Sequence, residues 1–311
     1  MGSPARLSLR HAIALGLAHG PAELLPISSS AHTILIPYLA GWPYGELDPE
    51  LRKSFEVALH AGTAVALLVD LRSLDSHPAL RALLARIGVA PTRKAVLAAT
   101  DPAELSPRRA LLVVALSFIP PAVVGYAFER PLQRRLSGPA TIIVGLLLGG
   151  AAMALADARC PHGRRPLARA SATDGLLLGL AQTCALLPGV SRSGAVLTVA
   201  RARGFGRADS GTLARRIGLP VIVGASALKT GRLLQRGANS ETPVGGAAIS
   251  DTRALLLGGG ASFLSTLAAT RLRRQGRGTQ TRAPLWPYAL YRGLLAAGVG
   301  RRLREAHNRD G

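Results

Sequence analysis

Charged side chains are scarce in this sequence. Of its 311 residues, 18% are Asp, Glu, Lys or Arg and 48% are apolar, whereas an average soluble domain is roughly 25% charged. Residues 110–128 and residues 137–156 carry no charged side chain. A helix needs roughly 20 apolar residues to cross the hydrocarbon core of a bilayer, which is about 30 Å thick. Shorter apolar runs cover residues 55–69, 175–190, 217–228, 254–270 and 284–300. A soluble protein is disfavoured, because its buried helices usually run to about 12 residues and keep a polar stripe. We predict a polytopic membrane protein.

Aromatic residues are also few, at 4%. The net charge of +21 could suggest nucleic acid, but the arginines fall in short connections such as "RPLQRR" and "RRLREAHNR". No basic stripe interleaved with aromatic residues is present, so we expect no nucleic acid as partner. Short basic loops are typical of the cytoplasmic side of a membrane protein and of contact with anionic lipid. Membrane lipids are therefore expected partners.

The chain has only two cysteines, Cys160 and Cys184. Their spacing fits neither a metal site nor an evident disulfide, so they do not indicate a redox compartment. The N-terminus has basic residues followed by a short apolar run, as in a signal peptide. We expect no cleavage, because a stretch rich in functional side chains begins inside that run.

An internal repeat lies about 162 residues apart. The stretch "LGLAHGPAELLPISSSAH" from Leu15 aligns with "LGLAQTCALLPGVSRSGA" from Leu178 when one residue is dropped. Both copies hold a Pro followed by a Ser-rich turn, which interrupts a helix. In a membrane, the exposed backbone groups must then be satisfied by protein or by a water-filled cavity. Each copy is therefore predicted to be a re-entrant helical hairpin.

Duplicated membrane proteins commonly have halves of inverted topology, with the site where the broken helices meet. We predict an all-α, polytopic integral membrane protein, an inverted-topology repeat with about six spans and two re-entrant helical hairpins. Residues 1–311 would form a single membrane domain. Residues 7–130 would form the first half, 137–300 the second, and 301–311 a basic C-terminal tail.

Side chains capable of chemistry gather in both copies. In the first, His19 and Glu23 are four residues apart and so share a helix face, and His32 follows a turn containing Ser28, Ser29 and Ser30. In the second, "PGVSRSG" places Arg192 next to an apolar run, and an arginine there is by default a functional residue. Its planar fork matches phosphate oxygens. An acid, a histidine, hydroxyls and an arginine are what phosphoryl transfer requires.

Other interpretations stay open for these residues. Serines after a proline are often helix caps or turns. Glu23 could couple protons in a transporter. The sole role of Arg192 could be to neutralise the charge of Glu23.

The motifs "AELLPISSSAH" and "LLPGVSRSGA" resemble the two signature regions of the bacterial undecaprenyl-diphosphatase family, the bacitracin-resistance type. The similarity continues in "KSFEVALHAGTAVALL", "IPPAVVGYAF" and "WPYALYRGLLAAG", and so covers nearly the whole chain. The resemblance implies an enzyme that hydrolyses undecaprenyl (polyprenyl) diphosphate to the monophosphate and phosphate. It would recycle the lipid carrier of cell-wall synthesis and give bacitracin resistance. It implies a multi-pass protein of the bacterial plasma membrane whose active site faces outward; a homodimer is a further expectation.

The resemblance also assigns roles to individual residues. Glu23, Ser29, His32 and Arg192 would be catalytic: Glu23 the second acid of the family motif, Ser29 the nucleophile or phosphate ligand, His32 the acid/base and Arg192 part of the diphosphate clamp. The expected substrate-binding residues are Ser28, Ser30, Gly189, Ser191, Ser193 and Gln182. Either Ser29 or a water would attack the phosphorus.

This chain departs from the family pattern at the first acid, where it has His19, and near His60. Two carboxylates suit Mg²⁺ or Ca²⁺, the cofactors that the resemblance implies, whereas a Glu with imidazoles suits Mn²⁺ or Zn²⁺ better. We therefore expect a divalent metal on Glu23 and His19. His60 could complete an altered metal or proton-relay site, and drift within a subfamily that keeps the usual chemistry is the alternative. The rival function is a lipid-carrier transporter or flippase of the same fold, because inverted repeats with broken helices also occur in transporters. A basic membrane scaffold without activity is a third reading.

Overall fold

The computed structural model describes residues 6–70, 105–136, 138–160, 163–238, 249–275 and 283–310. These residues are almost entirely helical, and within them the only extended pairing is an isolated bridge between Arg165 and Phe205. The predicted all-α class is confirmed. The helices are α1 (Leu9–Leu24), α2 (Ser29–Ala40), α3 (Pro49–Val69), α7 (Pro107–Leu136), α8 (Pro139–Arg159), η1 (Leu167–Arg169), α9 (Ala172–Cys184), α10 (Arg192–Ala202), α11 (Arg207–Ala238), α12 (Ile249–Gln275) and α13 (Trp286–Asp310).

Three helical segments in the described part of the chain are long and apolar enough to cross a membrane. They are Pro107–Phe128 in α7, Pro139–Arg159 in α8 and Asp251–Arg273 in α12. Their large apolar side chains are often exposed, as Val123, Leu148 and Leu256 are. Exposed apolar surface on such a scale is typical of contact with lipid. The membrane class is therefore supported, while the count of about six spans stays a prediction.

The chain divides into two compact units, each built from segments far apart in the sequence. The two repeat halves, residues 7–130 and 137–300, stay a prediction. The first unit holds residues Met1–Leu24, Ser29–Val69 and Val221–Gln275, and the second holds Leu25–Ser28, Asp70–Pro220 and Gly276–Gly311. The division inside α11 falls directly after Pro220, a proline within the helix. Residues 301–310 continue α13 as helix, whereas residues 137 and 311, at the ends of predicted segments, lie outside the described residues.

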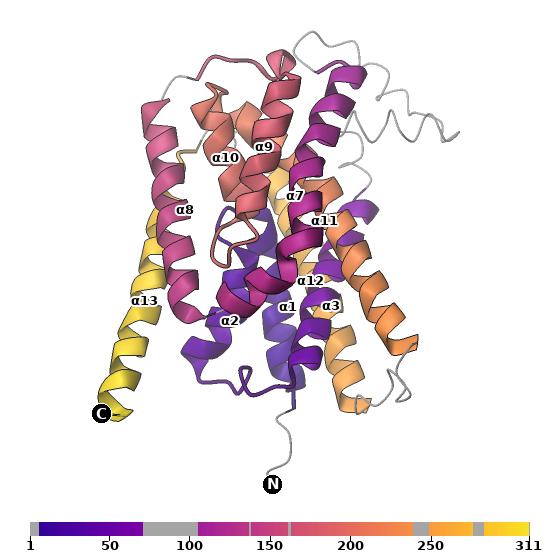
Figure 1. Ribbon diagram of the computed structural model, residues 1–311, viewed down its shortest axis with the longest axis vertical. Helices are drawn as coiled ribbons and strands as arrows, with labels where there is room; N and C mark the ends of the chain where they lie inside the picture. Colours follow the sequence, from indigo (N-terminus) through magenta and orange to yellow (C-terminus); the bar gives the residue numbers. More distant parts are fainter. Residues whose placement is uncertain are drawn as a thin grey trace. The chain divides into compact units, whose positions relative to one another are not determined.

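In the first unit, α1 and α3 both pack against α12 (Figure 1). The helices approach so closely that a Cβ at Gly62 of α3 would overlap the backbone oxygen of Gly259. Small residues at such contacts let backbones meet, as in many membrane helix pairs. Beside this contact, Leu15, Phe55 and Leu59 form part of a buried apolar cluster. The close packing fixes which residues of α1, α3 and α12 face one another.

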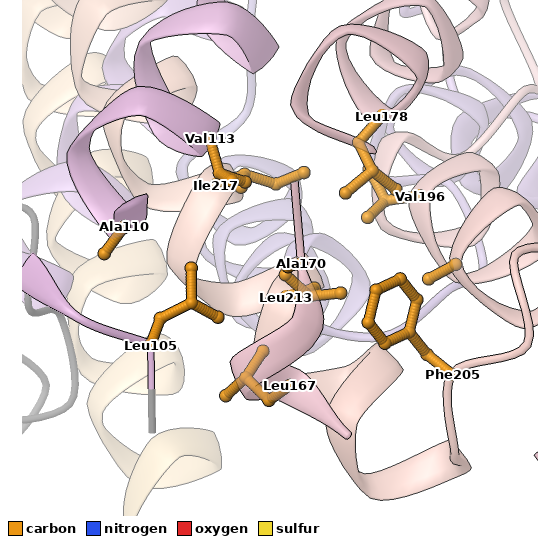
Figure 2. Packing of buried hydrophobic residues seen from close by; sticks show 11 residues of the cluster. Leu105, Ala110, Val113, Leu167, Ala170, Leu178, Val196, Phe205, Leu213 and Ile217 are labelled. Atoms are coloured by element: carbon orange, nitrogen blue, oxygen red, sulfur yellow. The ribbon is translucent and has the colours of Figure 1, made fainter. Parts of the chain in front are cut away.

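In the second unit, a cluster of buried apolar side chains joins α7, α9, α10 and α11 (Figure 2). The labelled side chains are Leu105, Ala110, Val113, Leu167, Ala170, Leu178, Val196, Phe205, Leu213 and Ile217. The helices α8 and α13 run side by side within the same unit (Figure 1). This core holds the α9–α10 hairpin, which carries the second repeat copy.

Buried ion pairs connect the helices of the second unit. Asp157 of α8 accepts hydrogen bonds from Arg201 of α10 at 2.8 Å and Arg207 of α11 at 2.9 Å. Arg201 is 1% exposed, and its guanidinium also donates to the backbone oxygens of Phe205 and Cys160. A buried charge is tolerated when it is paired and its hydrogen-bonding groups are satisfied. These two arginines thus serve the packing of the unit.

A second carboxylate anchors the start of α9. The Ser171 hydroxyl caps the helix by accepting from the Asp174 backbone N–H, and the Asp174 carboxylate accepts from the Ser171 backbone N–H. Such a capping box satisfies N–H groups that the first turn of a helix leaves unpaired. Asp174 also pairs with Arg165 at 2.5 Å and Arg203 at 2.8 Å.

Candidate active site

Both repeat copies form helical hairpins with the break where the sequence predicts it. In the first copy α1 ends at Leu24 and α2 begins at Ser29; in the second α9 ends at Cys184 and α10 begins at Arg192. Ser28 has a φ of 74°, and it is 3% exposed. A positive φ is uncommon for a residue other than Gly. Backbone strain of this kind gathers at functional sites, which supports a functional role for the first turn.

The structure brings Glu23 and Ser29 together across this turn. The Ser29 hydroxyl donates a short hydrogen bond to Glu23 Oε2. A hydroxyl bound to a carboxylate in this way is the arrangement by which a general base activates a nucleophile. The position of Ser29 is fixed as the first residue of α2, where its backbone oxygen accepts from the Thr33 hydroxyl at 3.0 Å.

His32 follows Ser29 by three residues on α2 and is 7% exposed. Side chains three apart in a helix lie on the same face, so the imidazole and the Ser29 hydroxyl share one side of α2. Ser30, by contrast, is exposed.

His19, Glu23 and His60 form a cluster whose ligand atoms all lie within 4.8 Å of one another. His19 and Glu23 come from α1, and His60 comes from α3. The two imidazole rings meet edge to face, with their centroids 4.7 Å apart. The sequence placed His19 and Glu23 on one helix face, and the packing of α3 brings His60 to the same place.

The donor set of this cluster fits a divalent metal. The Nε2 atom of His19 is buried and has no hydrogen-bond partner among the described residues, and such an orphaned buried atom calls for a ligand. Two imidazoles and one carboxylate are common ligands of Zn²⁺ and related ions. His60 and Glu23 are partly exposed, which gives an ion a way in.

In the second copy, the turn before α10 depends on Gly189. Its φ is 89°, and a Cβ there would overlap the backbone oxygen of Ile142 in α8. Only glycine meets both demands without strain. Ser191 then caps α10, because its Oγ accepts from the Gly194 N–H at 3.2 Å. Ser191 is thus a helix cap, its predicted contact with substrate stays a prediction, and Gly189 serves the close approach of the turn to α8.

Arg192 and Ser193 stand at the first turn of α10. The Arg192 Nη1 atom donates to the Gly218 backbone oxygen of α11 at 2.6 Å, which orients the guanidinium. The Ser193 hydroxyl donates to the Leu25 backbone oxygen at 3.0 Å. Leu25 belongs to the same unit as α10, so the turn after α1 contacts the start of α10 within that unit.

Gln182 lies inside the second unit. It is 2% exposed, and its side-chain Nε2 donates to the Ser117 backbone oxygen of α7 at 2.9 Å. The side chain thus links α9 to α7, and its predicted contact with substrate stays a prediction.

Three residues near the two motifs were not singled out from the sequence. The hydroxyls of Thr63 in α3 and Ser262 in α12 each lie 3.2 Å from His19 Nδ1. Arg292 of α13 is 1% exposed and donates from one Nη2 atom to the backbone oxygens of Gly145 and Gly189, each at 3.0 Å. The signal for Arg292 was available, since a lone arginine within the apolar run 284–300 calls for a partner.

Comparison with known proteins matches nearly the whole chain. The family described as bacitracin resistance protein BacA matches residues 12–298. The chain is 34% identical over 290 residues to an undecaprenyl-diphosphatase of Geobacter metallireducens, covering 93% of this chain and 96% of the relative. It is 35% identical over 294 residues to that of Geobacter sulfurreducens, covering 94% and 97%. The expected resemblance is confirmed, and the chain belongs to the bacitracin resistance protein BacA family.

Proposed function

We propose that this protein is a membrane phosphatase that hydrolyses undecaprenyl diphosphate to the monophosphate and inorganic phosphate. In this role it recycles the lipid carrier of cell-wall synthesis and gives resistance to bacitracin. The family and the relatives named undecaprenyl-diphosphatase support the activity. The structural observation that carries it is the hydrogen bond from the Ser29 hydroxyl to the Glu23 carboxylate. The findings give no support to a lipid transporter.

In this proposal the first turn of α10 binds the diphosphate of the substrate. The Arg192 guanidinium offers planar donors to phosphate oxygens, and the first backbone N–H groups of a helix attract an anion. Ser191 keeps this helix start in shape through its cap, and Ser193 adds a hydroxyl. Arg192 stabilises the charge on the transferring phosphoryl group, since phosphoryl transfer depends mainly on positioning and electrostatics.

The nucleophile in this proposal is Ser29. Its oxygen forms a bond to the terminal phosphorus, the bond from that phosphorus to the bridging oxygen breaks, and the lipid monophosphate leaves. The Ser29 proton passes to Glu23, the group that already accepts its hydrogen bond. A water then attacks the phosphoserine, with His32 as the base that takes the proton of that water. The bond between Ser29 Oγ and phosphorus breaks and phosphate leaves, Glu23 returns the proton to Ser29, and His32 releases its proton to solvent.

His19, Glu23 and His60 are the residues that would hold a divalent metal. Bound there, the metal supplies positive charge to phosphate oxygens. The chain's own part is to supply the two ring nitrogens and the carboxylate and to hold them in place through α1 and α3.

The protein acts, in this proposal, in the bacterial plasma membrane with its active site on the outer side. The apolar spans support a membrane location. Phosphate released from lipid diphosphate should appear outside intact spheroplasts, and appearance only after lysis would contradict the orientation. The expected homodimer should double the protein mass of the detergent complex in light scattering, and a single-chain mass would contradict it.

Phosphate release from undecaprenyl diphosphate in detergent tests the activity. We expect turnover by the wild-type protein, a loss of about 10²–10⁴-fold in Glu23→Ala, as for removal of a general base, and a larger loss in Ser29→Ala. Glu46→Gln and Ser8→Ala are matched controls at exposed positions and should keep full activity. An acid-quenched reaction should contain phosphoserine in the wild type and none in Ser29→Ala.

Each contrary outcome points to a different error. No phosphate release by the wild type would contradict the phosphatase and favour a transporter. Near-normal turnover by Ser29→Ala would contradict the serine nucleophile and assign the attack to water.

A further inference from the structure

We propose that His19, Glu23 and His60 form a site for a transition metal of the Zn²⁺ class. With these ligands the protein prefers such an ion to Mg²⁺ or Ca²⁺, the cofactors that the family resemblance implies. The three residues contribute two nitrogen ligands and one oxygen ligand within 4.8 Å of one another. A catalytic role for the metal rests on the proposed function, whereas metal binding can be measured independently of phosphatase activity.

The hydrogen bonds around His19 determine which ring nitrogen faces the cluster. Its Nδ1 atom lies 3.2 Å from the hydroxyls of both Thr63 and Ser262. The Ser262 hydroxyl already donates its proton to the Leu59 backbone oxygen at 2.9 Å, so towards His19 it can only accept. Ser262 thus offers an acceptor to a protonated Nδ1, and in that tautomer Nε2 presents a lone pair.

His60 reaches the same state by a simpler route. Its Nδ1 atom lies 2.8 Å from the Glu56 backbone oxygen, which can only accept a hydrogen bond. Nδ1 must therefore carry the proton, and Nε2 again holds the lone pair. Metal-binding histidines typically donate their other ring N–H to a carbonyl or a similar acceptor, which sets the tautomer and orients the ring.

The surroundings of His19 are built to hold that ring. The Thr63 hydroxyl lies 3.0 Å from Ser262 Oγ and 3.2 Å from Thr266 Oγ1. The Thr266 hydroxyl donates to the Ser262 backbone oxygen at 2.7 Å. This chain of hydroxyls from α3 and α12 supports the Nδ1 side, while the His19 Nε2 atom is left without a partner among the described residues. The arrangement is that of a metal ligand supported from behind.

The ligand types decide the metal. Mg²⁺ and Ca²⁺ prefer sites made of oxygen atoms, and only one of these three residues supplies oxygen. Imidazole nitrogen suits Zn²⁺, Co²⁺ and neighbouring transition metals, whose affinity for such sites exceeds that of Mn²⁺. Three protein ligands also leave coordination positions for a water or a phosphate oxygen, as in catalytic zinc sites.

Co²⁺ is the probe that tests this inference, because the intensity and position of its visible bands change when protein ligands replace water and the coordination number falls. The full-length protein in detergent is stripped with a chelator, dialysed and titrated with Co²⁺. We expect one Co²⁺ per chain with visible absorption bands. Stoichiometric Zn²⁺ should abolish these bands, and about a 100-fold excess of Mg²⁺ or Ca²⁺ should leave them in place.

Variants locate the ion. His60→Asn and His19→Gln should each weaken Co²⁺ binding at least about 10-fold, and Thr63→Val, which alters only a support of His19, by about 10–100-fold. His19→Glu should move the preference towards Mg²⁺ and Ca²⁺, because it supplies a second carboxylate. His11→Ala is the control: His11 also belongs to α1, but its ring stacks on Trp42 at 3.9 Å, and its removal should change nothing.

The inference is overturned if the stripped protein binds no Co²⁺, or if His60→Asn and His19→Gln bind it as the wild type does. It is also overturned if Mg²⁺ displaces Co²⁺ at equal concentration. The proposed function fails separately, when the metal-loaded protein binds Co²⁺ as expected and releases no phosphate. Full phosphate release by metal-free protein would leave the phosphatase intact and assign the histidine pair to proton relay.

Discussion

At the scale of single residues, the two motifs differ in how their side chains are used. Ser29 and Glu23 bind each other directly, which suits chemistry. Ser191 has a structural task as a helix cap, although the motif that contains it is the more specific one. A serine next to an arginine in such a motif is therefore no sign of catalysis in itself. What distinguishes Ser29 is the carboxylate that accepts its hydrogen bond.

At Arg192, a substitution can separate the effect of the planar guanidinium from the effect of its positive charge. We expect Arg192→Lys to lower kcat/KM by about 10²–10³-fold, in the range found for loss of one donor to a transition-state oxyanion. Lysine keeps the charge but loses the planar fork, which here also donates to Gly218. Phosphate-release kinetics measure the effect. Arg109→Lys, at an exposed position of α7, is the matched control, and equal losses in both variants would contradict the prediction.

At the scale of helices, each hairpin is held by contacts that lie far from it in the sequence. The turn before α10 lies against α8 through Gly189. Arg292 of α13 bonds the backbone oxygens of Gly145 and Gly189 and so joins α8 to that turn. Because a charged donor in a dry environment forms strong hydrogen bonds, α13 acts as a support for the second motif.

Replacing Gly189 tests this arrangement. Gly189→Ala should destabilise the protein by about 1–3 kcal/mol, because it forces a Cβ onto a residue with positive φ and against the Ile142 backbone oxygen. The midpoint of thermal unfolding in detergent should fall. In Gly298→Ala, where a Cβ meets nothing within 4 Å, the midpoint should stay or rise, because alanine favours a helix. Equal midpoints for the two variants would refute the close approach.

Replacing Arg292 removes the hydrogen-bond donors by which α13 holds the turn before α10, and so tests their contribution. Arg292→Met should cost about 1.5–3 kcal/mol of stability, as for hydrogen bonds to a charged group, and should lower kcat more than it changes KM for the substrate, if the turn before α10 shifts. Arg302→Met, at an exposed position of the same helix, is the control. Unchanged kcat together with normal stability in Arg292→Met would contradict a positioning role.

At the scale of the whole molecule, acid stability follows from the carboxylates that join its segments. Burial raises the pKa of Asp174, but hydrogen bonds from Arg165, Arg203 and Ser171 outweigh it and hold this pKa at about 2. The usual value is about 3.9. A carboxyl whose pKa is lower in the folded state stabilises the fold above its unfolded pKa. That stabilisation is lost as the pH falls through the folded pKa.

The pH dependence of unfolding measures this contribution. We expect wild-type stability to decline as the pH falls from about 4 to about 2, because Asp174 then takes up a proton. Asp174→Asn should lose about 3 kcal/mol at neutral pH, as when one partner of a buried ion pair is removed, and should show a smaller decline on acidification. An Asp174→Asn variant whose pH profile follows the wild type would show that other carboxyls govern acid stability.

The sequence by itself determined the membrane class, the helix breaks around Pro26 and Pro188, the family and the face shared by His19 and Glu23. All of these follow from local composition and spacing, which the chain carries without packing. The tertiary structure decided what faces His19. The packing of α3 and α12 against α1 brings His60, Thr63 and Ser262 to His19. It likewise brought Arg292 to Gly189 across 103 positions of sequence. Such contacts depend on how helices meet, and helical periodicity says which face a residue occupies but not which helix will cover it.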